Sequence, residues 1–354
     1  MTVLNVTLQT KKYDIMMEKG IINNIGFEIE KLYGGNRIAV ITDKNVYSLY
    51  GELVKNSLEH CGFNASFIIL EPGEKSKSMT VLESVYTRLL ESKITRGDMI
   101  IALGGGVVGD LGGFAASTYL RGVDYVQIPT SLLAQIDSSI GGKVAVNLEQ
   151  GKNLVGSFYH PKKVLIDPEV LNSLPDKFIK DGLGEVIKYA CIKDSELYEL
   201  LMRIKSKEEL LNNIDTIIFT CCNIKREIVE QDERDTGIRM ILNFGHTLGH
   251  AVEKYYNYET YTHGEAVAAG MYFITQKSEA LGYTEPGTSE KVKNLLTNFS
   301  IDYSFPNIDM NYIEETILLD KKNISENINL ILLKKIGEAY IAQMPVKNIN
   351  NFLK

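Results

Sequence analysis

Residues 98–117 read DMIIALGGGVVGDLGGFAAS and decide the fold of the first half of the chain. The apolar run Met99 to Leu103 has the length of a buried strand, and small residues in a helical pattern follow the glycines. The segment satisfies G-x-G-x-x-G between a strand and a helix, where backbone N–H groups can hold a pyrophosphate. A tight turn is the alternative explanation. The motif follows a later strand rather than the first one, with Asp110 directly behind the glycines, and both features depart from the usual Rossmann arrangement. We therefore predict dinucleotide binding in a variant sheet.

Short β-rich runs alternate with helical patterns on both sides of this stretch. We predict strands near residues 2–8, 13–18, 37–42, 65–70, 125–128 and 162–168, and a helix over 76–92 in which Thr80 and Glu83 form a capping box. From about Leu174 the pattern is nearly all helical, which places a domain boundary near Pro175. The expected architecture is a Rossmann-like α/β domain over residues 1–174 and an all-α domain over residues 175–354.

The composition excludes several classes of protein. A hydrophobic fraction of 44% and a charged fraction of 23% are typical of a globular protein. The net charge of -7 argues against nucleic acid as a partner, although a local basic cluster can still bind an anionic small molecule. The start of the chain lacks a signal peptide, and no apolar run is long enough to cross a membrane, so we expect a cytoplasmic protein. Four cysteines without C-x-x-C spacing are expected to be reduced thiols.

Three of the five histidines fall within residues 237–270. His246 and His250 are four residues apart in a helical pattern, so their imidazoles point the same way, and His263 opens a second helical pattern. Two helices can therefore aim three imidazoles at one point. An H-x-x-x-H pair is also common in ordinary helices, and a catalytic zinc site that keeps an open position would need a further ligand or carboxylate from elsewhere in the chain.

Other polar residues are grouped in two regions. The stretch from Tyr119 to Pro161, which includes the predicted strand at 125–128, is rich in Asp, Lys, Asn and Gly, although many loops share that composition. In the helical half, Glu185 and Lys188 are three residues apart, the spacing of an ordinary surface salt bridge. The candidates marked across both regions are Arg121, Asp137, Lys143, Lys152, Asn153, Lys188, Lys225, Arg239, Asn243 and the segment Asp320-Lys321-Lys322.

With these residues identified, the sequence resembles the 3-dehydroquinate synthases, the shikimate-pathway members of the sugar-phosphate cyclases. The resemblance covers essentially the whole chain through GGGVVGD, PTSLLAQIDSSIGGK, GKNLVG, GEVIK, LNFGHTLGHA, HGEAVAAGM and DKK, in that order. It implies an α/β domain that binds NAD and a helical domain that binds metal and substrate. It also implies a zinc ion, replaceable by Co²⁺, held by Glu185, His246 and His263, with His250 on the substrate side.

The reaction that the resemblance implies starts from 3-deoxy-D-arabino-heptulosonate 7-phosphate. Transient oxidation by NAD, elimination of phosphate, reduction by the same NADH and an intramolecular aldol closure give 3-dehydroquinate. The substrate carries a carboxylate and a phosphate, which require cations. The implied catalytic set is Lys143, Lys152, Asn153, Lys188, Lys225, Arg239, Asn243, His250, Arg121, Asp137 and Lys321, with Arg121 reaching across a homodimer.

The implied cofactor contacts lie mainly in the first half of the chain. They are Asp43, Asn45, Glu74, Lys77, Gly105, Gly106, Asp110, Thr130, Ser131, Leu133, Asp137, Lys143 and Lys152. Several positions depart from the pattern of the family: Ser131 replaces a second Thr, Val144 and Ala145 replace Thr and Gly, and Gly184 stands where Ala is common. These departures affect the expected rigidity of the segments that carry them, and they remove no implied ligand.

Three other functions compete with this interpretation. Another sugar-phosphate cyclase, such as 2-deoxy-scyllo-inosose synthase, would share zinc and NAD but act on a substrate without a carboxylate. An NAD-dependent polyol dehydrogenase of related fold would release NADH. A non-catalytic NAD- or zinc-binding protein on the same scaffold would be expected to lose a ligand or several cations. Retention of Lys152, Asn153, Lys225, Arg239 and His250 together favours the carboxylated substrate.

Overall fold

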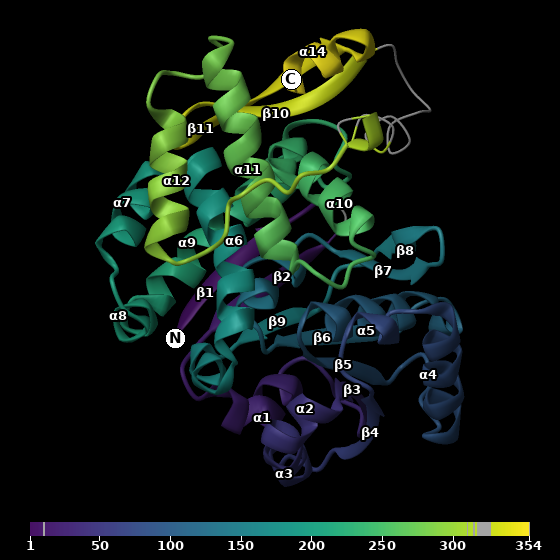
Figure 1. The fold of residues 1–354 in the computed structure, drawn as a ribbon. Coiled ribbons are helices and arrows are strands. Elements are labelled where there is room, and N and C mark those ends of the chain that lie inside the picture. The colour runs from purple at the N-terminus through teal and green to yellow at the C-terminus, as the bar shows by residue number, and fades with distance from the viewer. Residues whose placement is uncertain (10, 310, 314–315, 317–326, 354) are drawn as a thin grey trace. The chain divides into compact units, whose positions relative to one another are not determined.

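Two units make up the chain, Met1–Leu174 and Pro175–Lys354 (Figure 1). The computed structural model describes residues 1–9, 11–309, 311–313, 316 and 327–353. Within these residues no helix combines the length and the apolar character that crossing a bilayer requires.

The first unit is built on a seven-stranded sheet of order β1-β2-β9-β6-β5-β3-β4. β1 pairs antiparallel with β2, and every other neighbouring pair is parallel. The predicted strands are confirmed, with these bounds: β1 Thr2–Thr7, β2 Lys12–Met17, β3 Arg37–Asp43, β4 Asn64–Leu70, β5 Met99–Gly104, β6 Asp124–Pro129 and β9 Lys163–Ile166. The chain passes from β3 to β4 on one side and then to β5 on the other, so the strand order reverses at β3.

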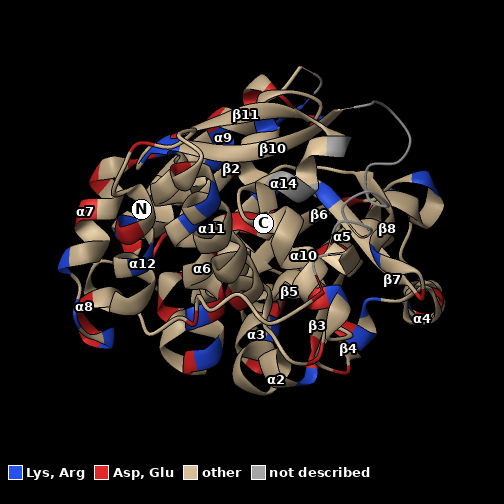
Figure 2. Ribbon diagram, turned by 45° about the horizontal axis from the view of Figure 1, so that its top comes forward, with Lys and Arg blue, Asp and Glu red and all other residues tan. Residues whose placement is uncertain are grey.

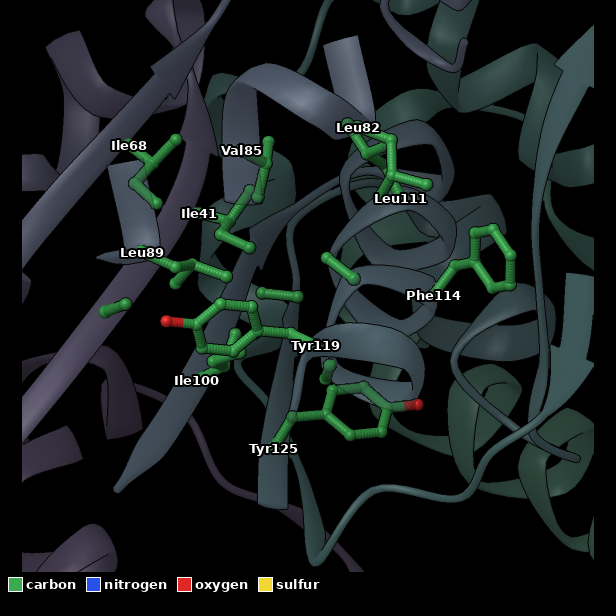
Figure 3. Packing of buried hydrophobic residues seen from close by; sticks show 14 of the residues in the cluster. Ile41, Ile68, Leu82, Val85, Leu89, Ile100, Leu111, Phe114, Tyr119 and Tyr125 are labelled. Carbon is green, nitrogen blue, oxygen red and sulfur yellow. The ribbon is translucent and has the colours of Figure 1, made fainter. Parts of the chain in front are cut away.

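Helices cover both faces of this sheet because its central strands are apolar on both faces. Ile100 of β5 packs in one cluster with residues of α4 (Met79–Glu91) and α5 (Gly106–Thr118), as Figure 3 shows. Its neighbour Ile101 packs in the opposite cluster with residues of α1 (Ile25–Glu30) and α3 (Glu52–His60). The alternation of side chains along a strand thus supplies both cores.

The predicted capping box of α4 is wrong. Ser78 is the N-cap, and its hydroxyl accepts from the Val81 N–H, so Thr80 lies inside the first turn. Ser78 is extended, as N-cap residues usually are, and it forms a bridge with Asn147 of β7 (Lys143–Leu148), which pairs with β8 (Gly151–Phe158). A residue distant in sequence therefore lies against the start of this helix.

The second unit is helical, as predicted, and its described residues include a β-hairpin that the all-α prediction lacked. The hairpin pairs β10 (Asn327–Lys335) with β11 (Glu338–Pro345). Four consecutive residues from Leu330 are buried, so the alternation that distinguishes a strand from a helix is missing there.

The helices are α6 Asp176–Lys193, α7 Ser195–Arg203, α8 Lys207–Asn212, α9 Ile214–Gln231, α10 His246–Tyr255, α11 His263–Ala280, α12 Thr288–Asn298 and α14 Ile349–Leu353, with the 3-10 turn η7 at Ile238–Asn243. Acidic and basic residues are interspersed on α7 and α8 (Figure 2).

Glycines let α6 and α11 approach each other closely. A Cβ on Gly184 would lie 2.7 Å from the Cα of Gly264, and a Cβ on Gly264 would lie 2.1 Å from the Asp181 carbonyl oxygen. The Gly264 N–H also donates to the Asp181 carboxylate at 2.7 Å. No side chain fits at this crossing, and the residues beside it, Glu185 and His263, are brought together.

We expect Gly184→Ala to destabilise the protein by about 1–3 kcal/mol, because the added methyl group overpacks the crossing and forces the two backbones apart. Urea unfolding followed by circular dichroism measures the change. Gly97→Ala is the matched control, since a Cβ at Gly97 meets no atom within 4 Å. Equal stability of the two variants would contradict the packing at the crossing.

Candidate active site

Three helices of the second unit bring one carboxylate and two imidazoles to a common point. Glu185 lies on α6, and His246 and His263 are the first residues of α10 and α11. The Glu185 Oε1 atom lies 3.3 Å from His246 Nε2 and 3.5 Å from His263 Nε2. Zinc bonds of about 2.0–2.2 Å in a tetrahedron separate neighbouring ligand atoms by roughly 3.3–3.6 Å. The donor set and its spacing therefore fit a tetrahedral divalent metal.

The second carboxylate oxygen of Glu185 has a different partner. Lys188 Nζ donates to Glu185 Oε2, and both side chains are almost completely buried. The surface salt bridge suggested by the i, i+3 spacing is therefore wrong for this pair. The lysine occupies one oxygen and leaves Oε1 facing the two histidines.

The ring nitrogens of the two histidines are also divided between two tasks. His246 Nδ1 lies 3.1 Å from the Phe244 carbonyl oxygen, so this nitrogen carries the proton and Nε2 carries the lone pair. Burial lowers the pKa of His246 to about 3 against the attraction of Glu185, so the ring is neutral at neutral pH. Burial also lowers the pKa of His263, but hydrogen bonds to Glu185 and Glu253 outweigh it and raise the pKa to about 10. A metal ion would displace that proton.

His250 lies beside this group and is exposed. Its ring centroid is 5.5 Å from that of His246 and 6.0 Å from that of His263. His250, Glu253 and His263 also offer ligand atoms that all lie within 4.8 Å of one another. Sequence reasoning missed Glu253, although its place seven residues after His246 puts it on the same face of α10.

Two further predicted cations of the second unit lie on elements that pack against α6. Lys225 is on α9 and is buried, and Arg239 is on η7 with only 2% of its surface exposed. Arg239 donates through Nη1 to the Glu233 carbonyl oxygen at 2.6 Å. Asn243 ends η7, and Lys321 lies outside the described residues.

Several of the predicted dinucleotide contacts of the first unit lie at the carboxyl edge of the seven-stranded sheet. Asp43 ends β3, Gly105 follows β5 and Thr130 follows β6, and the pairing of Gly104 with Pro129 aligns the last two strand ends. Because the strand order reverses at β3, this edge is where open α/β sheets bind ligands. The N-terminus of α5, a helix of 13 residues, also lies there.

The loops at this edge approach each other closely. A Cβ on Gly105 would lie 3.4 Å from Ser131 Oγ, and one on Gly106 would lie 3.2 Å from Ser138 Oγ. The Asp43 carboxylate caps α2 (Lys44–Val46) by accepting from the Asn45 and Val46 N–H groups. Leu133 lies in the short helical turn after Ser131. The glycines therefore keep backbone exposed between neighbouring loops, as the approach of a pyrophosphate requires.

Buried polar contacts join these loops to the β7–β8 hairpin. Lys77 donates to Asp110, and Asn147 donates to Glu74 at 2.7 Å. Burial lowers the pKa of Lys77, but the charges of Asp110 and Glu74 outweigh it and raise that pKa. Sequence reasoning missed Asn147, which no charge or glycine pattern marks.

The other predicted residues of the first unit are spread more widely. Lys143 begins β7, and Lys152 and Asn153 lie in β8, where the Asn153 N–H donates to Asn147 Oδ1 at 2.9 Å. Asp137 lies in η5 (Ala134–Ser138) after β6. Arg121 precedes β6 and so lies at the amino end of that strand, opposite the edge that carries Thr130.

Comparison with known proteins assigns the chain to a family. Family models described as 3-dehydroquinate synthase N-terminal and 3-dehydroquinate synthase C-terminal match residues 67–181 and 182–323. The chain belongs to the 3-dehydroquinate synthase family. A 3-dehydroquinate synthase of Clostridium beijerinckii is 55% identical over 344 residues, covering 97% of this chain and 98% of the relative. A 3-dehydroquinate synthase of Clostridium acetobutylicum is 53% identical and covers 100% of this chain and 99% of the relative.

Solved structures of sugar-phosphate cyclases share the fold of this 3-dehydroquinate synthase family member. The 2-epi-5-epi-valiolone synthase of Streptomyces hygroscopicus, solved with NAD⁺ and Zn²⁺ bound, has a TM-score of 0.88 at 25% identity and covers 98% of this chain and 97% of its own. A 2-deoxy-scyllo-inosose synthase has a TM-score of 0.85 at 22% identity, with 99% of each chain covered. At 22% identity, the similarity to the 2-deoxy-scyllo-inosose synthase shows a shared fold and nothing about function.

We expect Asp110→Asn to destabilise the protein by about 3 kcal/mol, because it removes the direct anionic partner of a buried lysine. The side chains of Lys77 and Asp110 are only 6% and 16% exposed. Glu71→Gln is the control, since its pair with Lys44 is 71% and 61% exposed and is expected to contribute less than about 1 kcal/mol. Chemical unfolding of both variants tests this, and a loss at Asp110 no larger than at Glu71 would contradict it.

Proposed function

We propose that the chain converts 3-deoxy-D-arabino-heptulosonate 7-phosphate into 3-dehydroquinate and phosphate, with NAD and a zinc ion as its cofactors and Co²⁺ as a substitute for zinc. The observation that carries the proposal is the group of Glu185, His246 and His263. Its oxygen–nitrogen distances of 3.3 and 3.5 Å match the edges of a zinc tetrahedron, in a chain at least half identical to named 3-dehydroquinate synthases. Three protein ligands leave a fourth position for substrate.

The cofactors and the residues divide the chemistry between them. When bound, zinc supplies Lewis acidity and NAD supplies reversible oxidation at one carbon of the substrate. Glu185, with one oxygen held by Lys188, is the single anionic ligand of the proposed site, so a divalent metal keeps a net positive charge that favours substrate hydroxyls.

The substrate anions would be held by fixed cations. Lys143, Asn153 and Lys225 are proposed to hold the carboxylate and the ring hydroxyls, and Arg239, Asn243, His250 and Lys321 the phosphate. Lys152 and Lys188 complete the cationic set, and Asp137 would contact cofactor and substrate. Support comes from Lys188, Lys225 and Arg239, which are buried although the chain is acidic overall. Buried positive groups are suited to anions because water screens them little.

The dinucleotide is proposed to bind at the carboxyl edge of the first unit. Gly105 and Gly106 would place backbone N–H groups and the start of α5 against the pyrophosphate. Asp43, Asn45, Glu74, Lys77, Asp110, Thr130, Ser131 and Leu133 complete the proposed contacts.

The proposal extends to assembly and location. We propose a cytoplasmic homodimer whose Arg121 serves the site of the partner subunit. The position of Arg121 at the amino end of β6, away from the proposed dinucleotide edge, supports a role outside its own cofactor site.

We expect His246→Ala to abolish zinc binding and His250→Ala to retain zinc while losing most turnover, because only His246 is a proposed ligand. Metal analysis of the purified variants after gel filtration measures the first property, and an assay of phosphate release measures the second. If both variants lose zinc equally, His250 is also a ligand and the division between the histidines is wrong.

We expect phosphate release from the heptulosonate phosphate to require NAD and to stop on treatment with a chelator. Absorbance at 340 nm should not accumulate in step with product, because the same NADH is reoxidised in each turnover. Release that persists without metal would refute the zinc assignment, and sustained NADH accumulation would identify a dehydrogenase instead. Glucose 6-phosphate in the same assay tests for a cyclase of uncarboxylated sugars.

A further inference from the structure

We infer that Glu253 is the positioning residue that fixes His263 for metal binding, an inference that rests on the proposed zinc site. Glu253 Oε2 lies 3.4 Å from His263 Nδ1, while His263 Nε2 lies 3.5 Å from Glu185 Oε1. The two ring nitrogens of His263 thus face two different carboxylates. Donation from Nδ1 to Glu253 leaves the lone pair on Nε2, directed at the proposed metal position.

The location of Glu253 is suited to this task. It is on the last turns of α10, 2% exposed, seven residues after His246 and on the same helix face. α10 and α11 are held close together there, since a Cβ on Gly249 would lie 3.1 Å from the Ala266 backbone. A buried carboxylate between two tightly packed helices has little freedom to turn away from His263.

The two histidine ligands are held by different kinds of acceptor. Phe244 offers a backbone carbonyl oxygen to His246, whereas Glu253 offers a charged oxygen to His263. A carboxylate that accepts from an imidazole increases the basicity of the opposite nitrogen, and loss of such a partner typically weakens metal affinity 10- to 100-fold. Glu253 therefore strengthens the His263 ligand as well as orienting it.

The same residues allow one competing arrangement. His250, Glu253 and His263 could hold a second cation, with Glu253 as a direct ligand. That arrangement would bind metal through Nδ1 of His263, the nitrogen that the positioning role assigns to a hydrogen bond. The metal content of the protein separates the two: one ion per chain for positioning, two for a second site.

The test compares Glu253→Gln and Glu253→Ala in the full chain. We expect zinc affinity, measured by competition with a chromophoric chelator, to fall roughly 10-fold in the Gln variant and up to roughly 100-fold in the Ala variant. Gln keeps an acceptor oxygen for His263 Nδ1 but loses the negative charge. The Gln variant therefore separates the effect of Glu253 on the orientation of the His263 ring from its effect on the basicity of Nε2. Glu279→Gln is the matched control, because Glu279 is on α11 and accepts from the Gly287 and Ser289 N–H groups, away from the histidines.

A purely structural role would lower thermal stability without changing the metal environment. We therefore expect the visible absorption of the Co²⁺-loaded protein to change in both Glu253 variants and to stay constant in Glu279→Gln. Unchanged zinc affinity and cobalt spectrum in Glu253→Ala, or two ions per wild-type chain, would overturn the inference. Wild-type protein that binds no zinc would instead overturn the proposed site itself.

Discussion

The second unit is organised around a carboxylate removed from water. Glu185 is completely buried, and an ionised carboxylate in such a place is very unfavourable unless positive groups and donors surround it. Lys188 occupies one oxygen and two imidazoles face the other. These partners come from three helices: Lys188 lies one turn further along α6, and the two histidines are the first residues of α10 and α11. Satisfying this one group therefore requires α6, α10 and α11 to meet at one point.

Much of the fold could be predicted from the sequence because local patterns agree with the tertiary structure. The apolar runs at Arg37 to Asp43 and Met99 to Gly104 are strands in the structure. The errors occur where a distant contact decides the local structure. Ser78, which forms a bridge with the distant residue Asn147, is the cap of α4 in place of Thr80. The β10–β11 hairpin was missed because four consecutive buried residues of β10, from Leu330 to Leu333, remove the alternation of a strand.

The site was predictable only in part, for a related reason. Histidine spacing marks the metal candidates, and the resemblance to a known family completes the set with Glu185. The i, i+3 spacing of a Glu–Lys pair puts both side chains on one face of a helix, whether that face is exposed or buried. The spacing therefore does not reveal that the pair Glu185–Lys188 is in the core. Asn147 has no charge or glycine pattern that marks it, and its contact with Glu74 joins two segments distant in sequence. Glu253 lies on the same helix face as His246, but its contact with His263 forms only where α10 and α11 pack together.

His246 and His263 share one further property, since each is the first residue of its helix. The N-terminus of a helix carries a partial positive charge, so two helix dipoles point their unfavourable ends at any cation bound here. Their field opposes a metal but favours the anionic groups of a substrate that approaches it. The backbone of these helices therefore affects the affinity for the cation and the affinity for the anion in opposite directions. Substitutions that lengthen or unwind either helix by one turn would change the two affinities together.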